Sequence, residues 1–191
     1  YFEASKIPIA KQNDITSALV AMCAKTNNCP AYQLSFRKSP IIGANAFALP
    51  GGYMVITDEL IDLAKNNDEI IAVLVHELGH VKGRHALRQT LQGTISGLII
   101  IAITGDVSSI ASGLPALMMN MSYSRELETE ADNYSLQSLS IACIPTKSFA
   151  TLLLRLEKSY GGGGSVPEMI SSHPDTKARI VPFLKDHSRC T

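Results

Sequence analysis

The sequence predicts an α+β domain that is mainly helical, with a small sheet beside two long helices. Apolar residues recur at helical spacing in several long segments, whereas strand-like patterns are confined to residues 31–56. The composition, 46% hydrophobic over 191 residues, supplies enough apolar surface for one core. We therefore expect residues 1–191 to form a single α+β domain.

The elements follow in chain order. A helix is expected at residues 13–24, and the sheet is expected from β-branched and aromatic residues in three strands, at residues 31–36, 41–48 and 53–56. Residues 37–40 join the first two strands, which on their own predict a core hairpin. Helical patterns then occupy residues 58–65, a segment of roughly 20 residues that begins at Asn66, and residues 124–139, 146–160 and 176–185. Residues 66–69, Asn-Asn-Asp-Glu, offer the N-cap oxygen of the second of these helices.

The helix that begins at Asn66 carries the most informative motif, His76-Glu77-Leu78-Gly79-His80. Histidines four residues apart lie on one helical face, where both can bind one Zn²⁺ while the intervening Glu reaches the attacking water. The alternative is a pair of core histidines hydrogen-bonded to the backbone or to carboxylates. The adjacent Glu77 favours the metal.

Zinc in a catalytic site takes three protein ligands and keeps one open position, so a third ligand must come from elsewhere in the chain. The helix at 124–139 offers Glu126, Glu128 and Glu130, and the spacing to Asp132 favours Glu128 because the two lie four residues apart on one face. Asp132 can then accept the free ring N–H of a ligand histidine. The alternative is a solvated acidic face.

With one Zn²⁺ per chain bound by His76, His80 and Glu128, the reaction class is peptide hydrolysis. Glu77 is the expected general base, which takes a proton from water and delivers it to the leaving amine. His173 and Arg179 are the candidates for stabilising the oxyanion. Taken alone, His173-Pro174 also fits a simple turn ahead of a helix. A structural zinc site is disfavoured, since such sites use four ligands.

These motifs resemble peptidase family M48. Residues 45–52 and the spacing His173-Pro174-x-x-x-x-Arg179 extend the resemblance, which covers about residues 40–185. It implies a zincin-like fold, the zinc ligands and base already named, and a strand beside the active site in which Asn45 and Ala46 face the substrate. By resemblance to the periplasmic members, an alternative role for His173 is to occupy zinc's open position and hold the enzyme latent.

The resulting functional prediction is a zinc endopeptidase that hydrolyses misfolded or unassembled envelope proteins. The alternative is a chaperone-like binding module, latent or non-catalytic, built on the same zinc fold. Intact Glu77 favours the enzyme, because a scaffold needs no general base. The partners of the predicted enzyme are protein or peptide substrates. Peripheral contact to a membrane or to an envelope assembly is an open alternative. The 17 basic and 17 acidic residues balance, which argues against nucleic acid as a partner.

Two segments carry less information. The apolar run 95–103, extended through 113–119, is too short to span a bilayer and predicts a core helical hairpin, or alternatively a lid or membrane-facing patch over the cleft. Residues 161–165, Gly-Gly-Gly-Gly-Ser, predict a flexible connection.

Four cysteines are spread along the chain without metal-binding spacing. We expect two disulfides, Cys23–Cys29 and Cys143–Cys190, among three connectivities, and four buried thiols are the alternative. Disulfides indicate an oxidising compartment, the periplasm or cell envelope of a bacterium. No signal sequence or anchor is visible, which suits a mature or trimmed chain.

Overall fold

The structure, a computed structural model, describes residues 2–93, 123–160, 173 and 176–185. Helices dominate and a small sheet accompanies them, which confirms the α+β class. In chain order the elements are β1 Glu3–Ala4, α1 Ile9–Thr26, β2 Gln33–Lys38, β3 Ala46–Leu49, β4 Tyr53–Thr57, α2 Asp58–Leu63, α3 Asn67–Lys82, α6 Arg125–Ala142, α7 Lys147–Tyr160 and α9 Thr176–Leu184.

The described strands form one sheet in the order β1-β2-β4-β3. β2 runs parallel to β4, from Gln33 opposite Tyr53 to Arg37 opposite Thr57, while β3 pairs antiparallel with β4. The expectation that strands 31–36 and 41–48 form a hairpin is therefore wrong. Residues 39–45 are the reason: they turn, with Gly43 at φ 71°, and carry the chain past β4, so that β3 lies at its far side.

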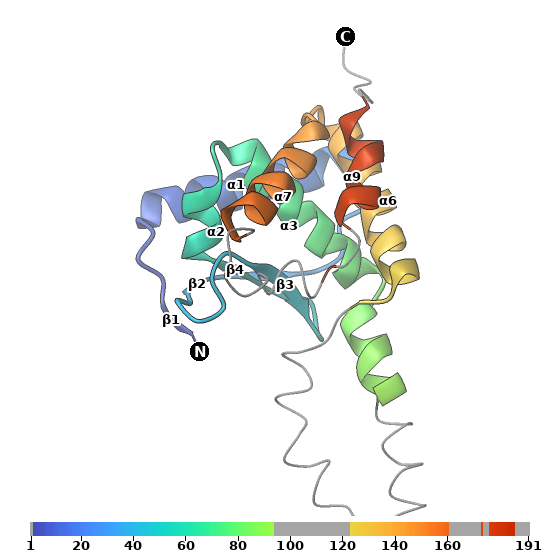
Figure 1. The fold of residues 1–191 in the computed structure, drawn as a ribbon, viewed down its shortest axis with the longest axis horizontal. Coiled ribbons are helices and arrows are strands. Elements are labelled where there is room, and N and C mark those ends of the chain that lie inside the picture. Colours follow the sequence, from blue (N-terminus) through green and yellow to red (C-terminus); the bar gives the residue numbers. More distant parts are fainter. Residues whose placement is uncertain (1, 94–122, 161–172, 174–175, 186–191) are drawn as a thin grey trace, which may run out of the picture.

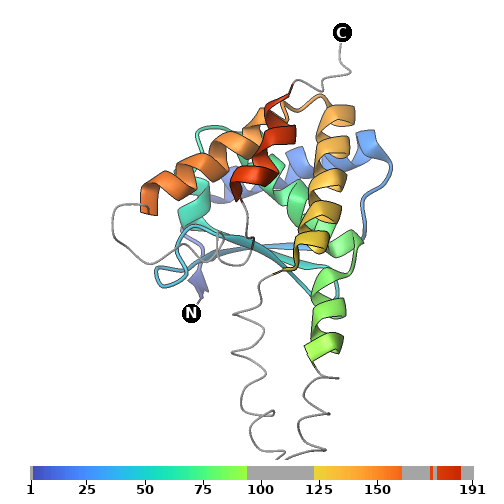
Figure 2. The same cartoon turned by 45° about the vertical axis from the view of Figure 1, so that its right-hand side comes forward.

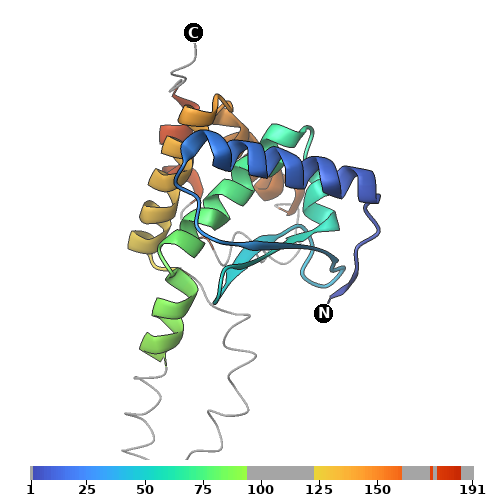
Figure 3. The same cartoon turned by 180° about the vertical axis from the view of Figure 1, so that it is seen from behind.

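The labelled helices lie on one side of the sheet, and the helical segment 85–93 extends beyond the level of the sheet (Figure 1). Helix α3 runs through the middle of this layer, α7 and α9 cover it on one side, and α1 crosses it on the opposite side, as the view from behind shows (Figure 3). Twelve consecutive residues of α3, from Glu69 to His80, are buried. The histidine motif is thus held on the most enclosed element of the described fold.

Helix α3 begins and ends where its terminal residues dictate. The Asn66 side chain accepts a hydrogen bond from the Glu69 backbone N–H at 3.0 Å, so the expected N-cap is confirmed. The expected length is wrong, because the helix stops at Lys82. The chain turns at Gly83 and at Arg84, whose φ is 51°, before helical structure resumes at residues 85–93 (Figure 2). This break turns the segment after α3 away from the α3 axis.

Helix α6 packs directly against α3, and Gly79 allows the two backbones to come close. A Cβ built on Gly79 would lie 2.8 Å from the Ala131 Cα and 2.9 Å from its carbonyl oxygen. Any larger residue would push the two helices apart. Ser124 caps α6 by accepting the Leu127 N–H, as its place ahead of the acidic segment suggests. Gly79 thereby brings the carboxylates of α6 to the histidines of α3.

The predicted Cys23–Cys29 disulfide is present at the end of α1. Cys143 is also disulfide-bonded, and its predicted partner Cys190 lies outside the described residues, as do the apolar run 95–119 and the glycine-rich connection 161–165. Among the described helices, none combines the length and the apolar character that crossing a membrane would require.

Candidate metal centre

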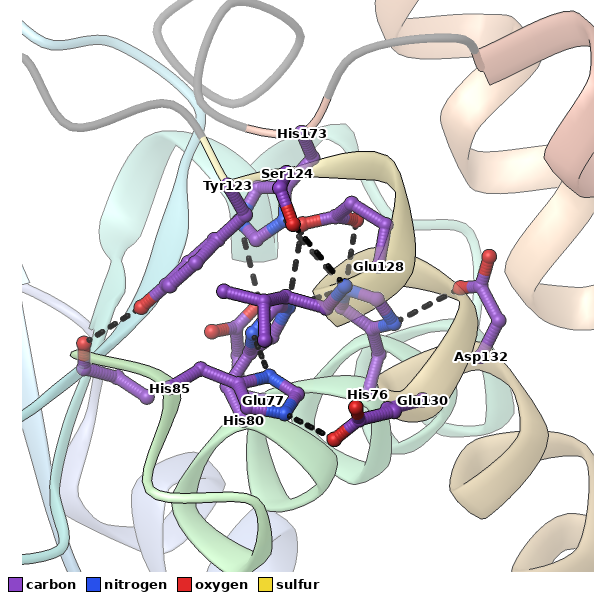
Figure 4. A network of polar contacts seen from close by, with 12 residues as sticks. His76, Glu77, His80, His85, Tyr123, Ser124, Glu128, Glu130, Asp132 and His173 are labelled. Carbon is purple, nitrogen blue, oxygen red and sulfur yellow. Dashed lines mark hydrogen bonds and ion pairs between the residues drawn. The ribbon is translucent and has the colours of Figure 1, made fainter. Parts of the chain in front are cut away.

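Four buried side chains from three parts of the chain meet beside α3 (Figure 4). His76 and His80 come from α3, Glu128 comes from the first turn of α6, and His173 precedes α9. One nitrogen or oxygen of each lies within 4.8 Å of the corresponding atom of every other. The structure therefore brings Glu128, rather than Glu126 or Glu130, to the two imidazoles.

The separations match those around a small metal ion. The Nε2 atoms of His76 and His80 are 3.0 Å apart, and they lie 3.5 and 3.4 Å from the Glu128 carboxylate oxygens. Ligand atoms about 2.0–2.1 Å from a tetrahedral zinc would be about 3.3–3.4 Å apart. His76, His80 and Glu128 thus fit a divalent ion without rearrangement of the backbone.

His173 extends the same cluster. Its Nδ1 lies 2.9 Å from Glu128 Oε1 and 3.4 Å from His76 Nε2, and its ring is buried. The two roles expected for this side chain, oxyanion donor and fourth ligand, both require a position beside the metal. The structure places His173 against His76 and Glu128, and its role stays a prediction.

Asp132 and Arg179 contact the cluster through His76 and Glu128, respectively. Asp132 Oδ1 lies 3.0 Å from His76 Nδ1, as expected for a carboxylate that orients a ligand histidine. Arg179 binds Asp132 through two hydrogen bonds of 2.7 Å and also pairs with Glu128. The Arg179 guanidinium therefore fixes the carboxylates of Glu128 and Asp132, and its expected role at the oxyanion stays a prediction.

Glu77 lies in the same enclosed space with a carboxylate that has no hydrogen-bond partner. Its side chain is 0% exposed, and among the described residues neither of its oxygens finds a donor; His173 Nε2 lies 3.6 Å from Oε1. Buried polar atoms are almost always paired, with protein or with ordered water. Both Glu77 oxygens are thus free for a water molecule or another small donor.

The surroundings of the cluster keep two carboxylates ionised, and, against the effect of burial, these raise the pKa of His76 to about 9. Burial alone would raise the pKa of Glu128, but His173 and the other imidazoles hold it well below its usual range. Burial likewise opposes ionisation of Asp132, and Arg179 reverses this, so the Asp132 pKa is lowered. By contrast, burial raises the pKa of Glu77 and lowers that of His80. The ionised Glu128 therefore faces neutral His80, and the ionised Asp132 faces His76.

Two side chains that contact His80, Tyr123 and His85, were not predicted from the sequence. The Tyr123 ring stacks on the His80 imidazole at a centroid distance of 4.0 Å, and the Tyr123 hydroxyl donates to the Ala48 carbonyl at 3.4 Å. His85 Nδ1 lies 2.9 Å from His80 Nδ1. Tyr123 directly precedes Ser124, the N-cap of α6, and no sequence motif at this position predicts a contact with His80. His85 is visible in the sequence as a histidine five residues after His80, but its direction depends on the unpredicted turn.

A cavity of about 390 Å³ opens beside His80, between β3, the turn after it and the start of the helical segment 85–93. Most of its lining is apolar. It includes Ala31, Ala48, Leu49, Val81, Ala86 and Leu87. β3 is the outermost strand of the described sheet on this side, and its residues Ala48 and Leu49 line the cavity together with His80.

Asn45 and Ala46, the expected substrate contacts, are both buried, at 2% and 0% exposure. The Asn45 N–H and carbonyl are both engaged by Thr57, at 2.8 and 2.9 Å. Backbone groups alternate in direction along an antiparallel pair, so the N–H and C=O of Ala46 and Ala48 point to the free edge. The Ala46 backbone groups thus point away from β4, whereas those of Asn45 are engaged by Thr57. The substrate-facing role of both residues stays a prediction.

The comparison with known proteins decides the family. The sequence profile of peptidase family M48 matches residues 10–185, nearly the whole chain. The chain belongs to peptidase family M48. This confirms the metallopeptidase prediction. The buried cluster of His and Glu side chains therefore belongs to a member of a metallopeptidase family.

Several relatives of this M48 peptidase are named proteases. It is 32% identical to the mitochondrial metalloendopeptidase OMA1 of Saccharomyces cerevisiae, over 81% of this chain and 46% of that protein. It is 28% identical to the putative beta-barrel assembly-enhancing protease of Vibrio cholerae, over 72% and 31%, and 28% identical to the metalloprotease LoiP of Escherichia coli, over 92% and 72%. The chain spans less than half the length of the first two.

Proposed function

We propose that this M48 peptidase is a zinc endopeptidase that hydrolyses peptide bonds in misfolded or unassembled proteins of the bacterial cell envelope. One observation carries the proposal. The buried Glu77 carboxylate, which has no hydrogen-bond partner among the described residues, lies beside three ligand atoms spaced for one metal ion. A general base needs such a free carboxylate, and a structural site does not.

In this proposal His76 Nε2, His80 Nε2 and Glu128 hold Zn²⁺. Bound zinc supplies Lewis acidity, which brings the pKa of coordinated water to about 7 and polarises the scissile carbonyl. Glu77 removes a proton from the attacking water and gives it to the departing amine nitrogen. Asp132 keeps His76 oriented by accepting its Nδ1–H, and Arg179 keeps Asp132 in place.

The proposed substrate is an extended segment of polypeptide. The backbone N–H and C=O of Ala46 and the N–H of Ala48, at the outer edge of β3, would bind it by strand addition, which accepts varied sequences because the contacts are to main chain. The apolar cavity beside His80 would receive a hydrophobic side chain. Segments that are both extended and hydrophobic are exposed mainly in unfolded or unassembled proteins, which supports that substrate class.

The cell-envelope location rests on two supports. The Cys23–Cys29 disulfide suits an oxidising compartment. The Vibrio cholerae relative is named a putative beta-barrel assembly-enhancing protease, so its name links it to the assembly of other proteins. The OMA1 relatives are named as mitochondrial, so the bacterial assignment remains part of the proposal.

Chelation tests this function. We expect the purified chain to cleave unfolded casein, to lose that activity in the presence of a strong zinc chelator, and to regain it when one equivalent of Zn²⁺ is returned. Casein binding is measured in parallel by fluorescence anisotropy. Casein that binds equally well with and without metal, and is never cleaved, would contradict the peptidase and support the chaperone-like binding module.

The position of His173 favours a latent form of the enzyme. Its Nδ1 lies on the cluster within 3.4 Å of His76 Nε2 and 2.9 Å of Glu128 Oε1, close enough to act as a fourth ligand. We propose that His173 occupies the position that water needs during catalysis. Release of His173 would then activate the enzyme.

Replacement of His173 by Ala tests this latency. We expect hydrolysis of casein to increase, about tenfold if roughly nine molecules in ten are held latent, because activity scales with the competent fraction. Initial rates at matched zinc content are the measurement, with zinc affinity as the second readout. A fall in rate would instead assign His173 to stabilisation of the oxyanion.

A further inference from the structure

A series of three hydrogen-bonded side chains, His80, His85 and Glu130, leads from the metal cluster to the surface on the side opposite Asp132. His80 Nδ1 faces His85 Nδ1 at 2.9 Å, and His85 Nε2 faces Glu130 Oε2 at 3.0 Å (Figure 4). His85 is 0% exposed along its side chain, whereas Glu130 is 51% exposed and also accepts a hydrogen bond from Arg88 at 2.9 Å. None of these contacts is needed for the roles assigned above.

Among His80, His85 and Glu130, only one arrangement of hydrogen-bond donors and acceptors leaves a lone pair on His80 Nε2 for a metal ion. An ionised Glu130 can only accept, so His85 Nε2 must carry a hydrogen. A neutral His85 then has a lone pair at Nδ1, and His80 must donate its Nδ1–H to it. His80 Nε2 is left unprotonated and directed at His76 and Glu128, as a metal ligand requires.

The backbone is shaped to keep the His85 ring in this place. A Cβ built on Gly83 would lie 2.0 Å from His85 Nε2, so the ring occupies the space that any side chain at position 83 would fill. Arg84, in the left-handed region with φ 51°, turns the chain so that His85 points back toward α3. An apolar residue would fill the same space without a hydrogen bond, so the imidazole serves for more than packing.

We infer that His85, held by Glu130, is a positioning residue that fixes the tautomer and orientation of His80 for metal binding. This inference rests on the proposed metal site. His76 and His80 would then be oriented by separate acceptors, Asp132 on one side and His85 with Glu130 on the other. Outer hydrogen-bond partners of this kind typically contribute about 10–100-fold to metal affinity.

Zinc affinity of His85 variants is the test, measured by competition with a chelator of known affinity. We expect His85→Leu to bind Zn²⁺ about 10–100-fold more weakly than the unmodified chain, because the His80 Nδ1–H loses its acceptor. His85→Gln, whose amide oxygen can accept that hydrogen, should recover most of the loss. Arg88→Ala, which contacts Glu130 only at the surface, is the matched control and should change affinity by less than about twofold.

A second readout does not depend on metal or activity. Nitrogen-15 chemical shifts of the imidazoles in the unmodified chain should show a hydrogen on His80 Nδ1 and on His85 Nε2. Equal zinc affinity in the unmodified and His85→Leu chains, with only the thermal unfolding midpoint lowered, would overturn the inference and make His85 structural. Absence of zinc binding in the unmodified chain would overturn the proposed metal site and this inference together, so the two failures are distinguishable.

Discussion

Replacement of Glu77 by Gln is expected to lower the rate of casein hydrolysis by about 10²–10⁴-fold, the usual contribution of a general base. Gln has nearly the same size but cannot take a proton from water. Because neither Glu77 oxygen has a hydrogen-bond partner among the described residues, the exchange breaks no hydrogen bond there and alters only the 3.6 Å approach of His173. Zinc content and the unfolding midpoint should therefore stay the same.

Single-turnover rates at equal zinc occupancy provide this measurement. The control is Asp62→Asn, which removes an exposed carboxylate from the neighbouring helix α2 and should leave the rate unchanged. If the Glu77→Gln enzyme hydrolyses casein at the normal rate, another group is the base. If it loses zinc as well as activity, Glu77 belongs to the metal site instead.

Replacement of Glu128 by Gln should have the second large effect, on metal binding itself. Glu128 supplies two oxygens near the imidazole nitrogens, at 3.4 and 3.5 Å, and the surrounding groups hold its pKa well below the usual range. An amide offers a weaker, uncharged ligand. We expect zinc affinity to fall by more than the roughly 10–100-fold typical of losing an outer partner, and hydrolysis to disappear with it.

Chelator competition measures this loss, and Glu126→Gln provides the matched control. Glu126 is an exposed carboxylate in the same first turn of α6, so its removal tests for a general effect of charge on the helix. The Glu126 variant should bind zinc like the unmodified chain. Normal zinc affinity in the Glu128 variant would exclude Glu128 as a ligand.

The parts of the centre that local spacing governs could be predicted from sequence. His76 and His80 lie on one face of α3 because the residues between them form a regular helix, and Glu128 and Asp132 lie one turn apart on α6 for the same reason. The Asn66 cap and the first disulfide were equally local. In each case a few neighbouring residues determine the geometry.

The parts that escaped prediction depend on distant pairing or on a single backbone angle. β2 lies parallel to β4 rather than beside β3, because strand pairing is chosen by the whole sheet and not by the connection at 39–45. His85 reaches His80 only because the chain turns at Arg84, where φ is 51°. Tyr123 stacks on His80 from a position without a pattern. Local periodicity carries no information on any of these contacts.

The decisive test of the proposed zinc site is a crystal structure of the zinc-loaded chain, with anomalous scattering recorded at the zinc absorption edge. We expect one anomalous peak per chain, about 2.0–2.2 Å from His76 Nε2, His80 Nε2 and a Glu128 oxygen. A peak held by other residues, or none in protein that hydrolyses casein, would contradict the proposed zinc site.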